Sequence, residues 1–89
     1  MPTFTRDNVS LNYRVLGDDG PWIVLTPGGR QGMEGVTWLG ESLAADGYRV
    51  LLHDRRNCGA SDVYFDDALS EQEVWADDVH ALLSDLGAL

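Results

Sequence analysis

Two short stretches hold the residue types that could do chemistry. The first is "LTPGGRQG", residues 25–32, in which Gly28 and Gly29 directly follow an apolar run. Two adjacent glycines let the backbone approach another group closely, and a ligand is one candidate for that group. The second is "DRRNCGASD", residues 54–62, which combines a thiol and a hydroxyl with charged side chains. Thiols and hydroxyls are candidate nucleophiles.

Ser61 lies in "GASDV", residues 59–63, which matches the first four positions of the nucleophile elbow G-x-S-x-G. An elbow requires a strand that ends at the serine and a helix that starts directly after it. Here the preceding apolar run ends at His53, and Val63 replaces the last glycine of the motif. We therefore expect Ser61 not to be a nucleophile.

Cys58 is the single cysteine of the chain, so an internal disulfide framework and a thiolate metal cage are both excluded. No basic side chain that could activate its thiol is evident nearby, and we expect a small buried filler. His53 ends an apolar run, which predicts a core or loop-bracing role. His80 falls on the polar side of the last expected helix and is predicted to face solvent.

The elements that must position these residues begin with a hairpin. Residues 3–5 and 9–17 are predicted as two strands joined at Asp7 and Asn8, a residue pair typical of turns. Two later runs, residues 22–26 and 48–53, lack the polar alternation of a half-exposed strand. Such runs are typical of parallel strands that are covered on both faces.

A helix is expected over residues 36–47, between those two runs. Leu39 and Leu43 are four residues apart, as on one helix face, and Gly47 stands where a terminating glycine belongs. Strand, helix and strand together predict a βαβ unit with a parallel pair.

A second helix is predicted from a capping box and an apolar stripe. Ser70 and Glu73 match S-x-x-E, and Gly87 is the expected end. The stripe consists of Trp75, Val79, Leu82, Leu83 and Leu86. The acidic residues of this helix, Asp77, Asp78 and Asp85, are then expected mostly on the solvated side.

Length and charge restrict the functions that are open to this chain. Its 89 residues allow at most one small domain. The chain has six arginines and fifteen acidic residues, and its formal charge of -9 repels phosphate backbones and anionic membranes. We expect no nucleic-acid partner and no membrane partner. The start of the chain lacks the pattern of a signal peptide, so a cytoplasmic location is expected.

The stretch at residues 54–62 fits the pattern D-x-R-x-x-G-x-S-D. Its matching residues are Asp54, Arg56, Gly59, Ser61 and Asp62. Together with "LTPGG" behind a strand, this pattern resembles the α/β-hydrolase superfamily. Members of that superfamily show D-x-R-G-x-G-x-S after the fourth strand and a glycine loop, often H-G-x, after the third.

The resemblance extends over nearly the whole chain, from the opening hairpin to the helix that precedes the nucleophile strand. It implies an α/β fold class, the N-terminal part of a three-layer α/β-hydrolase with hairpin, βαβ unit and final helix. Residues 1–89 would then be the incomplete N-terminal segment of one domain. The complete enzyme would hydrolyse an ester, amide or C–C bond, with a serine as the most plausible nucleophile and without cofactor or metal.

Two positions depart from the family pattern. Pro27 stands where many members have a histidine that braces the glycine loop, which weakens assignment to any one subfamily. Asn57 replaces a usual glycine, and asparagine is among the few residues that accept a positive φ.

The resemblance also implies roles for the glycine loop. The backbone N–H of Gly29 would be one donor of an oxyanion hole, which stabilises the negative oxygen of a tetrahedral intermediate. Gly28 would let the turn form, and Arg30 would line the mouth of the pocket, so both are candidate substrate-binding residues. A plain tight turn behind the strand is the alternative interpretation of these residues.

The nucleophile, the acid and the catalytic histidine are expected outside this chain. In the family the histidine comes last in chain order, which neither His53 nor His80 matches. We therefore expect the chain alone to be inactive and to be completed by a companion polypeptide or a second copy, with a small-molecule substrate.

Two other functions remain open on the sequence. One is a non-catalytic interaction scaffold derived from the same fold. The other is a nucleotide-binding βαβ domain, in which Asp54 would take the place of the acid that binds a ribose. Against the second, Gly28, Gly29 and Gly32 do not form G-x-G-x-x-G.

Overall fold

The computed structural model describes residues 2–65 and 70–88. Its elements are β1 (Thr3–Arg6), β2 (Val9–Leu16), β3 (Trp22–Leu25), a 3₁₀ turn (Met33–Val36), α1 (Thr37–Ala45), β4 (Arg49–His53) and α2 (Glu71–Asp85). The predicted order of hairpin, βαβ unit and final helix is confirmed, and element ends differ from prediction by a few residues at most.

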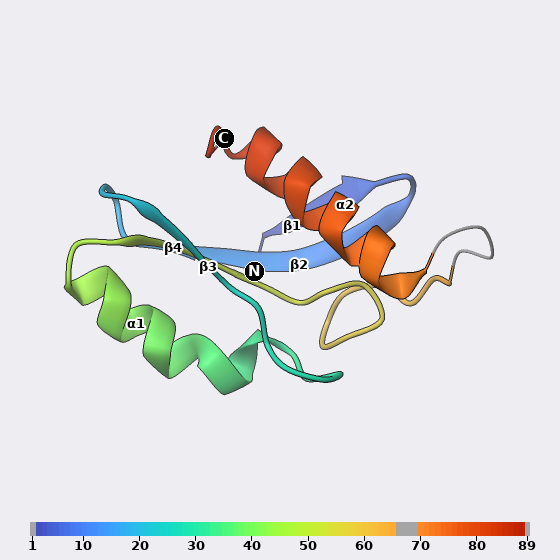
Figure 1. The fold of residues 1–89 in the computed structure, drawn as a ribbon, viewed down its shortest axis with the longest axis horizontal. Coiled ribbons are helices and arrows are strands. Elements are labelled where there is room, and N and C mark those ends of the chain that lie inside the picture. Colours follow the sequence, from blue (N-terminus) through green and yellow to red (C-terminus); the bar gives the residue numbers. More distant parts are fainter. Residues whose placement is uncertain (1, 66–69, 89) are drawn as a thin grey trace.

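The four strands form one sheet in the order β1-β2-β4-β3. The pairs β1–β2 and β2–β4 are antiparallel, whereas β3 and β4 are parallel, with Val24 opposite Leu51. Helix α1 covers one face of the sheet and α2 the other (Figure 1), which makes three layers. Both glycine-containing loops that carry the candidate chemistry follow the parallel strands.

The core lies along the central strand β4. Val50, Leu51 and Leu52 are completely buried, and α1 packs on this strand next to the buried Met33. Gly40 of α1 lets the helix approach the sheet, since a Cβ there would come within 3.1 Å of the Leu52 side chain. Burial of such aliphatic side chains is the main driving force for folding.

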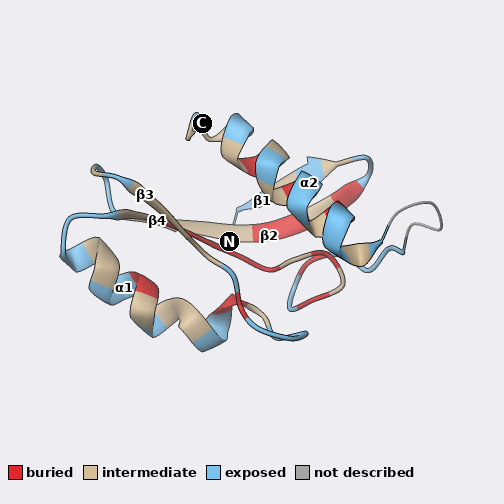
Figure 2. Cartoon of the chain, viewed as in Figure 1, coloured by how far each residue is buried: buried red, intermediate tan, exposed pale blue. Residues whose placement is uncertain are grey.

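Strand β3 differs from the expectation that both parallel runs are covered. Residues of β3 are all half-buried, whereas most of β4 is fully buried (Figure 2). The reason is topological, because β3 lies at the end of the strand order and pairs only with β4 among the described residues. Its outer edge presents backbone groups that another strand could pair with.

The turns follow the predicted residue chemistry. Asp7 and Asn8 both adopt positive φ, 51° and 66°, as the tight turn between β1 and β2 requires. Gly47 and Gly87 have φ of 98° and 72° just beyond α1 and α2, where they end these helices. No helix of the described residues is long and apolar enough to cross a membrane.

Helix α2 begins as predicted, with the Ser70 side chain accepting the Glu73 amide at 3.2 Å. The predicted apolar stripe faces inward, since Leu82 is buried and the other stripe residues are half-buried, and Asp77 and Asp85 are exposed as expected.

Asp78, however, is buried together with Val74 and Leu82, so the expectation that it faces solvent is wrong. The physical reason is that its carboxylate pairs with the buried Arg56 and the half-buried Arg6.

Candidate functional site

The loop after β4 is built around the Asp54 carboxylate, which is buried. This carboxylate accepts hydrogen bonds from the Met33 amide at 2.5 Å, the Ala60 amide at 2.8 Å and the Asn12 side chain at 3.0 Å. It therefore ties the start of the 3₁₀ turn and strand β2 to its own loop. Since its oxygens are already engaged, Asp54 is poorly placed to bind a ribose, which counts against the nucleotide-binding alternative.

Gly59 packs directly against that carboxylate. A Cβ at this position would lie 2.5 Å from the Asp54 carboxylate carbon, and the φ of 53° favours glycine as well. Asn57 also adopts a positive φ, 71°, as its chemistry predicted. These backbone requirements explain the spacing of the motif in structural terms.

Ser61 and Cys58 take structural places, in agreement with the sequence prediction. The Ser61 hydroxyl is buried, donates to the Asp54 carbonyl at 2.6 Å and accepts the Asn12 amide at 2.8 Å. Cys58 is buried and unbridged. With its proton engaged inside the loop, the serine is not arranged as a nucleophile.

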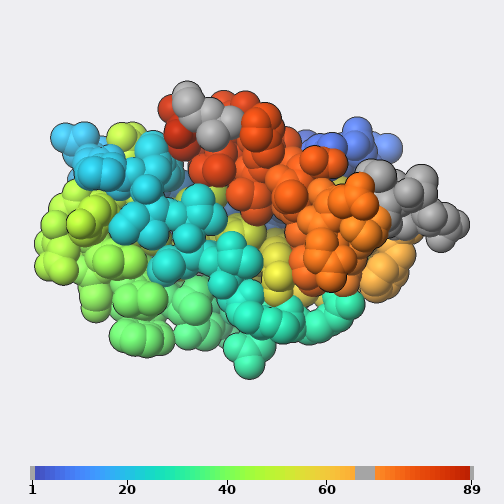
Figure 3. Space-filling model, viewed as in Figure 1, coloured from blue at the N-terminus to red at the C-terminus, as the bar shows by residue number. Residues whose placement is uncertain are grey.

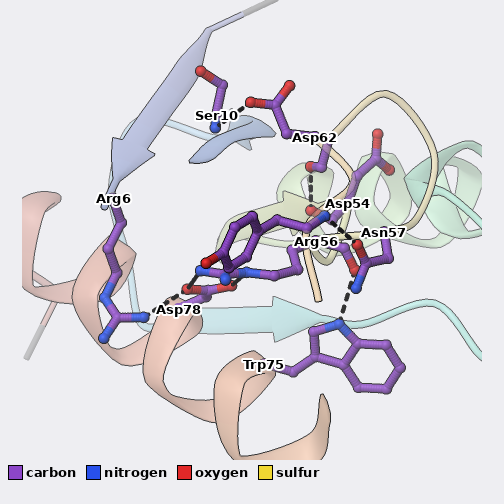
Figure 4. A network of polar contacts seen from close by, with 10 residues as sticks. Arg6, Ser10, Asp54, Arg56, Asn57, Asp62, Trp75 and Asp78 are labelled. Carbon is purple, nitrogen blue, oxygen red and sulfur yellow. Dashed lines mark hydrogen bonds and ion pairs between the residues drawn. The ribbon is translucent and has the colours of Figure 1, made fainter. Parts of the chain in front are cut away.

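A buried charge network joins this loop to α2 and β1. Arg56 donates two hydrogen bonds to the Asp78 carboxylate, both at 2.8 Å, and Arg6 adds a third at 2.8 Å. Figure 4 shows Asp78 between the two guanidinium groups. The indole N–H of Trp75 donates to the Arg56 carbonyl at 2.9 Å. The sequence pattern identified Arg56 but not its partner Asp78.

His53 connects the ends of the two parallel strands. It is buried, and its Nε2 lies 2.9 Å from the Thr26 hydroxyl, so it braces the loops as predicted. Burial is the main cause that lowers the pKa of His53 from 6.5 to about 4, and the charge of Arg55 lowers it further. The imidazole is therefore neutral near pH 7.

The loop after β3 has a different character. The Gly28 carbonyl accepts the Gln31 amide at 3.2 Å, and Gly29 adopts a φ of 57° inside this turn. In a trans peptide the C=O and the next N–H point in opposite directions. Because the Gly28 carbonyl points into the turn, the Gly29 N–H points out of it.

The space on the Cβ side of these glycines is open. A Cβ on Gly28 or Gly29 would meet nothing within 4 Å, and both residues are exposed. Within residues 2–65 and 70–88, neither of their amides donates a hydrogen bond. An open hollow of about 630 Å³ is lined by Gln31 and Gly32 of this loop and by Asp54, Gly59 and Ala60 of the loop after β4. The exposed glycine turn thus offers unpaired N–H groups next to a hollow that both loops border.

The loop after β3 reaches the start of α2 (Figure 3), where Arg30 forms an ion pair with Glu71. Its guanidinium donates two hydrogen bonds of 2.6 Å to Glu71, whose carboxylate also accepts the Asn57 side chain at 2.9 Å. The bonds from Arg30 lower the pKa of Glu71. Sequence reasoning did not foresee this pair, which joins residues 41 positions apart.

The oxyanion role of Gly29 and the substrate-binding roles of Gly28 and Arg30 stay predictions at this stage. Gly28 and Gly29 lie in one accessible turn, and Arg30 follows them with its charge already paired. Among the described residues, no three side chains of the metal-ligating types come together as a metal site.

Comparison with solved structures reveals close likenesses over almost the entire chain. The enol-lactonase from Burkholderia xenovorans LB400 is 27% identical, with a TM-score of 0.82 over 97% of this chain and 33% of its own. An N-acyl homoserine lactone degrading enzyme is 28% identical, with a TM-score of 0.76 over 97% of this chain and 32% of its own.

The α/β hydrolase domain-containing protein 10 from mouse is 24% identical, with a TM-score of 0.77 over 94% of this chain and 34% of its own. The chain therefore spans about a third of the length of the solved structures it matches. No protein-family profile matches the sequence, and no curated protein matches it either.

Proposed function

We propose, on the premise that this chain has the fold of the N-terminal third of an α/β-hydrolase, that residues 1–89 supply the oxyanion-hole loop of a serine hydrolase. The observation that carries the proposal is the Gly29 amide, which points out of its turn and donates no hydrogen bond within the described residues. Residues 1–89 are then one segment of a single domain.

The chemistry follows from that amide. When a nucleophile adds to a carbonyl carbon, the carbonyl oxygen becomes an anion, and a preplaced N–H stabilises it without reorganisation. Carboxyl esters, lactones among them, are the proposed substrate class. Two of the similar structures are an enol-lactonase and an N-acyl homoserine lactone degrading enzyme, which supports this choice. In this role Arg30 acts as part of its ion pair with Glu71 at the mouth of the site.

The nucleophile, the acid and the catalytic histidine are proposed to lie on polypeptide outside residues 1–89. Ser61 is engaged in its own loop, and His53 is buried against Thr26. The outer edge of β3 is the natural attachment point for the remaining sheet, because its half-buried residues pair on one side only within the described chain. The partner is thus the remaining fold, in the same or a companion polypeptide.

A covalent probe tests where the nucleophile lies. Antibodies against residues 1–89 recover the assembly or longer polypeptide that contains them, and a fluorophosphonate then labels its reactive serine. We expect the label on a G-x-S-x-G serine outside residues 1–89. Label on Ser61, or saturable ester hydrolysis by residues 1–89 that Ser61→Ala abolishes, contradicts the proposal. A recovered assembly with no reactive serine favours the non-catalytic scaffold.

A single-atom change tests the oxyanion donor itself. Cys58 allows residues 1–57 and 58–89 to be joined chemically, so glycolic acid can replace Gly29 and its N–H becomes an ester oxygen. In the reconstituted assembly we expect kcat to fall roughly 10²- to 10³-fold while KM changes little. The matched control replaces Gly17, at the far end of β3, by the same chemistry and keeps full activity. Equal kcat for both variants contradicts the role of Gly29.

A further inference from the structure

The Gly29 carbonyl has a partner from outside its own loop. Arg55, two residues beyond β4, donates a hydrogen bond from Nη2 to this oxygen. The Arg55 guanidinium lies over the Trp75 ring of α2, with 3.9 Å between Cζ and the ring centroid. A guanidinium stacked on an indole is held by both dispersion and the charge of the ring face.

Trp75 is itself fixed. Its indole N–H is bonded to the carbonyl of Arg56, the residue next to Arg55, at 2.9 Å. One turn further along α2, Asp78 binds the Arg56 side chain. The helix, the loop after β4 and the glycine loop are therefore connected in one chain of contacts that passes through Arg55.

The glycine loop needs such an external contact, because adjacent glycines have more backbone freedom than any other residues. Its own turn holds only the Gly28 carbonyl, through the Gln31 amide. The Gly29 carbonyl belongs to the next peptide unit, and its orientation depends on Arg55. Fixing this unit limits the ψ of Gly29, which lies between the two peptide planes.

The second contact of the loop is more exposed. The Arg30 side chain is 60% exposed, forms a bidentate pair with Glu71 and lies farther from the Trp75 ring than Arg55 does, 5.7 Å against 3.9 Å from the centroid. Arg55 bonds to the Gly29 carbonyl itself, whereas Arg30 anchors the loop one residue further along, at the end of its own side chain. Arg55 is therefore the contact that acts directly on the peptide unit next to the Gly29 amide.

We propose that Arg55, stacked on Trp75, is the positioning residue that keeps the Gly29 amide aimed out of its turn. The inference rests on the proposed oxyanion role of Gly29 for its catalytic consequence, but its structural part is independent of any activity. Arg55 acts through the backbone of Gly29 and does not touch the substrate.

The structural part is tested in residues 1–89 by ¹⁵N relaxation. Arg55→Met removes the guanidinium and retains an apolar side chain of similar length. We expect the order parameters of Gly29 and Arg30 to fall from about 0.85, typical of rigid backbone, to below about 0.6. The matched control is Arg49→Met, because Arg49 also stacks on a tryptophan, Trp22 at 4.6 Å, but outside the site.

The catalytic part is tested in the assembly that contains the remaining fold. We expect Arg55→Met to lower kcat roughly 10- to 100-fold with KM nearly unchanged, since misplacement of a catalytic group affects mainly the transition state. Arg55→Lys, which keeps a donor, restores part of kcat. Trp75→Phe, which keeps a ring but loses its bond to Arg56, gives a smaller reduction and serves if Arg55→Met does not fold.

The outcomes separate this inference from the proposed function. Unchanged order parameters in Arg55→Met and Trp75→Phe overturn the inference, and the glycolic acid experiment at Gly29 still decides the oxyanion role. A more mobile loop with unchanged kcat also overturns the inference, because the order of the loop then has no effect on the donor. A loosened loop with reduced kcat, while Arg49→Met matches the native chain in both, supports it.

Discussion

The loops that follow the two parallel strands use glycine in opposite ways. After β4, a Cβ on Gly59 would lie 2.5 Å from the Asp54 carboxylate, so this glycine is required by close packing. After β3, a Cβ on Gly28 or Gly29 would meet no atom within 4 Å. Gly59 thus packs against a side chain of its own loop, whereas the Cβ side of Gly28 and Gly29 is open, although residues of both loops line the hollow of about 630 Å³.

The two loops also differ in whether their polar groups are hydrogen-bonded within the chain. The buried carboxylates of Asp54 and Asp78 each accept three hydrogen bonds from the chain. The Gly28 and Gly29 amides donate none within the described part of the chain. Satisfied groups stabilise a fold, whereas unpaired donors beside empty space are suited to an external acceptor. This contrast gives residues 54–62 an architectural role and is the basis on which we propose chemistry at residues 26–32.

The largest effect is expected where the loop after β4 is anchored to α2. Asp78→Ala leaves Arg56 and Arg6 without their buried partner, and loss of one member of such a network costs about 3–5 kcal/mol. Asp77→Ala, an exposed neighbour on the same helix, is the control and changes stability by less than about 0.5 kcal/mol. Urea unfolding followed by tryptophan fluorescence measures both. Equal midpoints for the two variants contradict the assignment.

The two glycine environments can be compared directly by the same substitution. Gly59→Ala adds a Cβ against Asp54 at a φ of 53°, and we expect a loss of about 3 kcal/mol from backbone strain and overpacking together. Gly28→Ala meets open space without a positive φ, so its effect on unfolding stays below about 0.5 kcal/mol. A large loss of stability in Gly28→Ala would show that its surroundings are packed after all.

The sequence predicted several local features of the fold well. Ser70 as a helix cap, Asn57 at positive φ and the terminating Gly87 all depend on neighbouring residues, whose chemistry is visible along the chain. The α/β order and the buried β4 follow from apolar runs in the same way.

The sequence did not predict contacts between residues far apart in the chain. Helical periodicity placed Asp78 outward, because no local pattern reveals that Arg56 and Arg6, 22 and 72 residues away, would surround it. The pairing of Arg30 with Glu71 and the contact of Arg55 with Gly29 are unpredictable for the same reason. The glycine pair could be found from the sequence, but the residues that position it could not.

The bond between His53 and Thr26 joins the ends of the two parallel strands. The pH dependence of the unfolding free energy tests this bond, and it is the smallest of the expected effects. The pKa of His53 is lowered to about 4, so the unfolded chain takes up a proton from pH 6.5 downward while the folded chain stays neutral until about pH 4. Stability is then lost as the pH falls through this window, by about 2 kcal/mol at pH 5 relative to pH 8.

The His53 contribution is the part of this pH dependence that His53→Gln removes, since glutamine keeps a hydrogen-bonding group toward Thr26 but does not titrate. His80→Gln, on the exposed face of α2, retains the full native dependence. Urea unfolding at pH 5 and pH 8 gives the four values needed for each comparison. If His53→Gln keeps the native slope, the acid sensitivity does not arise from His53, and the link between the two loops does not depend on a neutral imidazole.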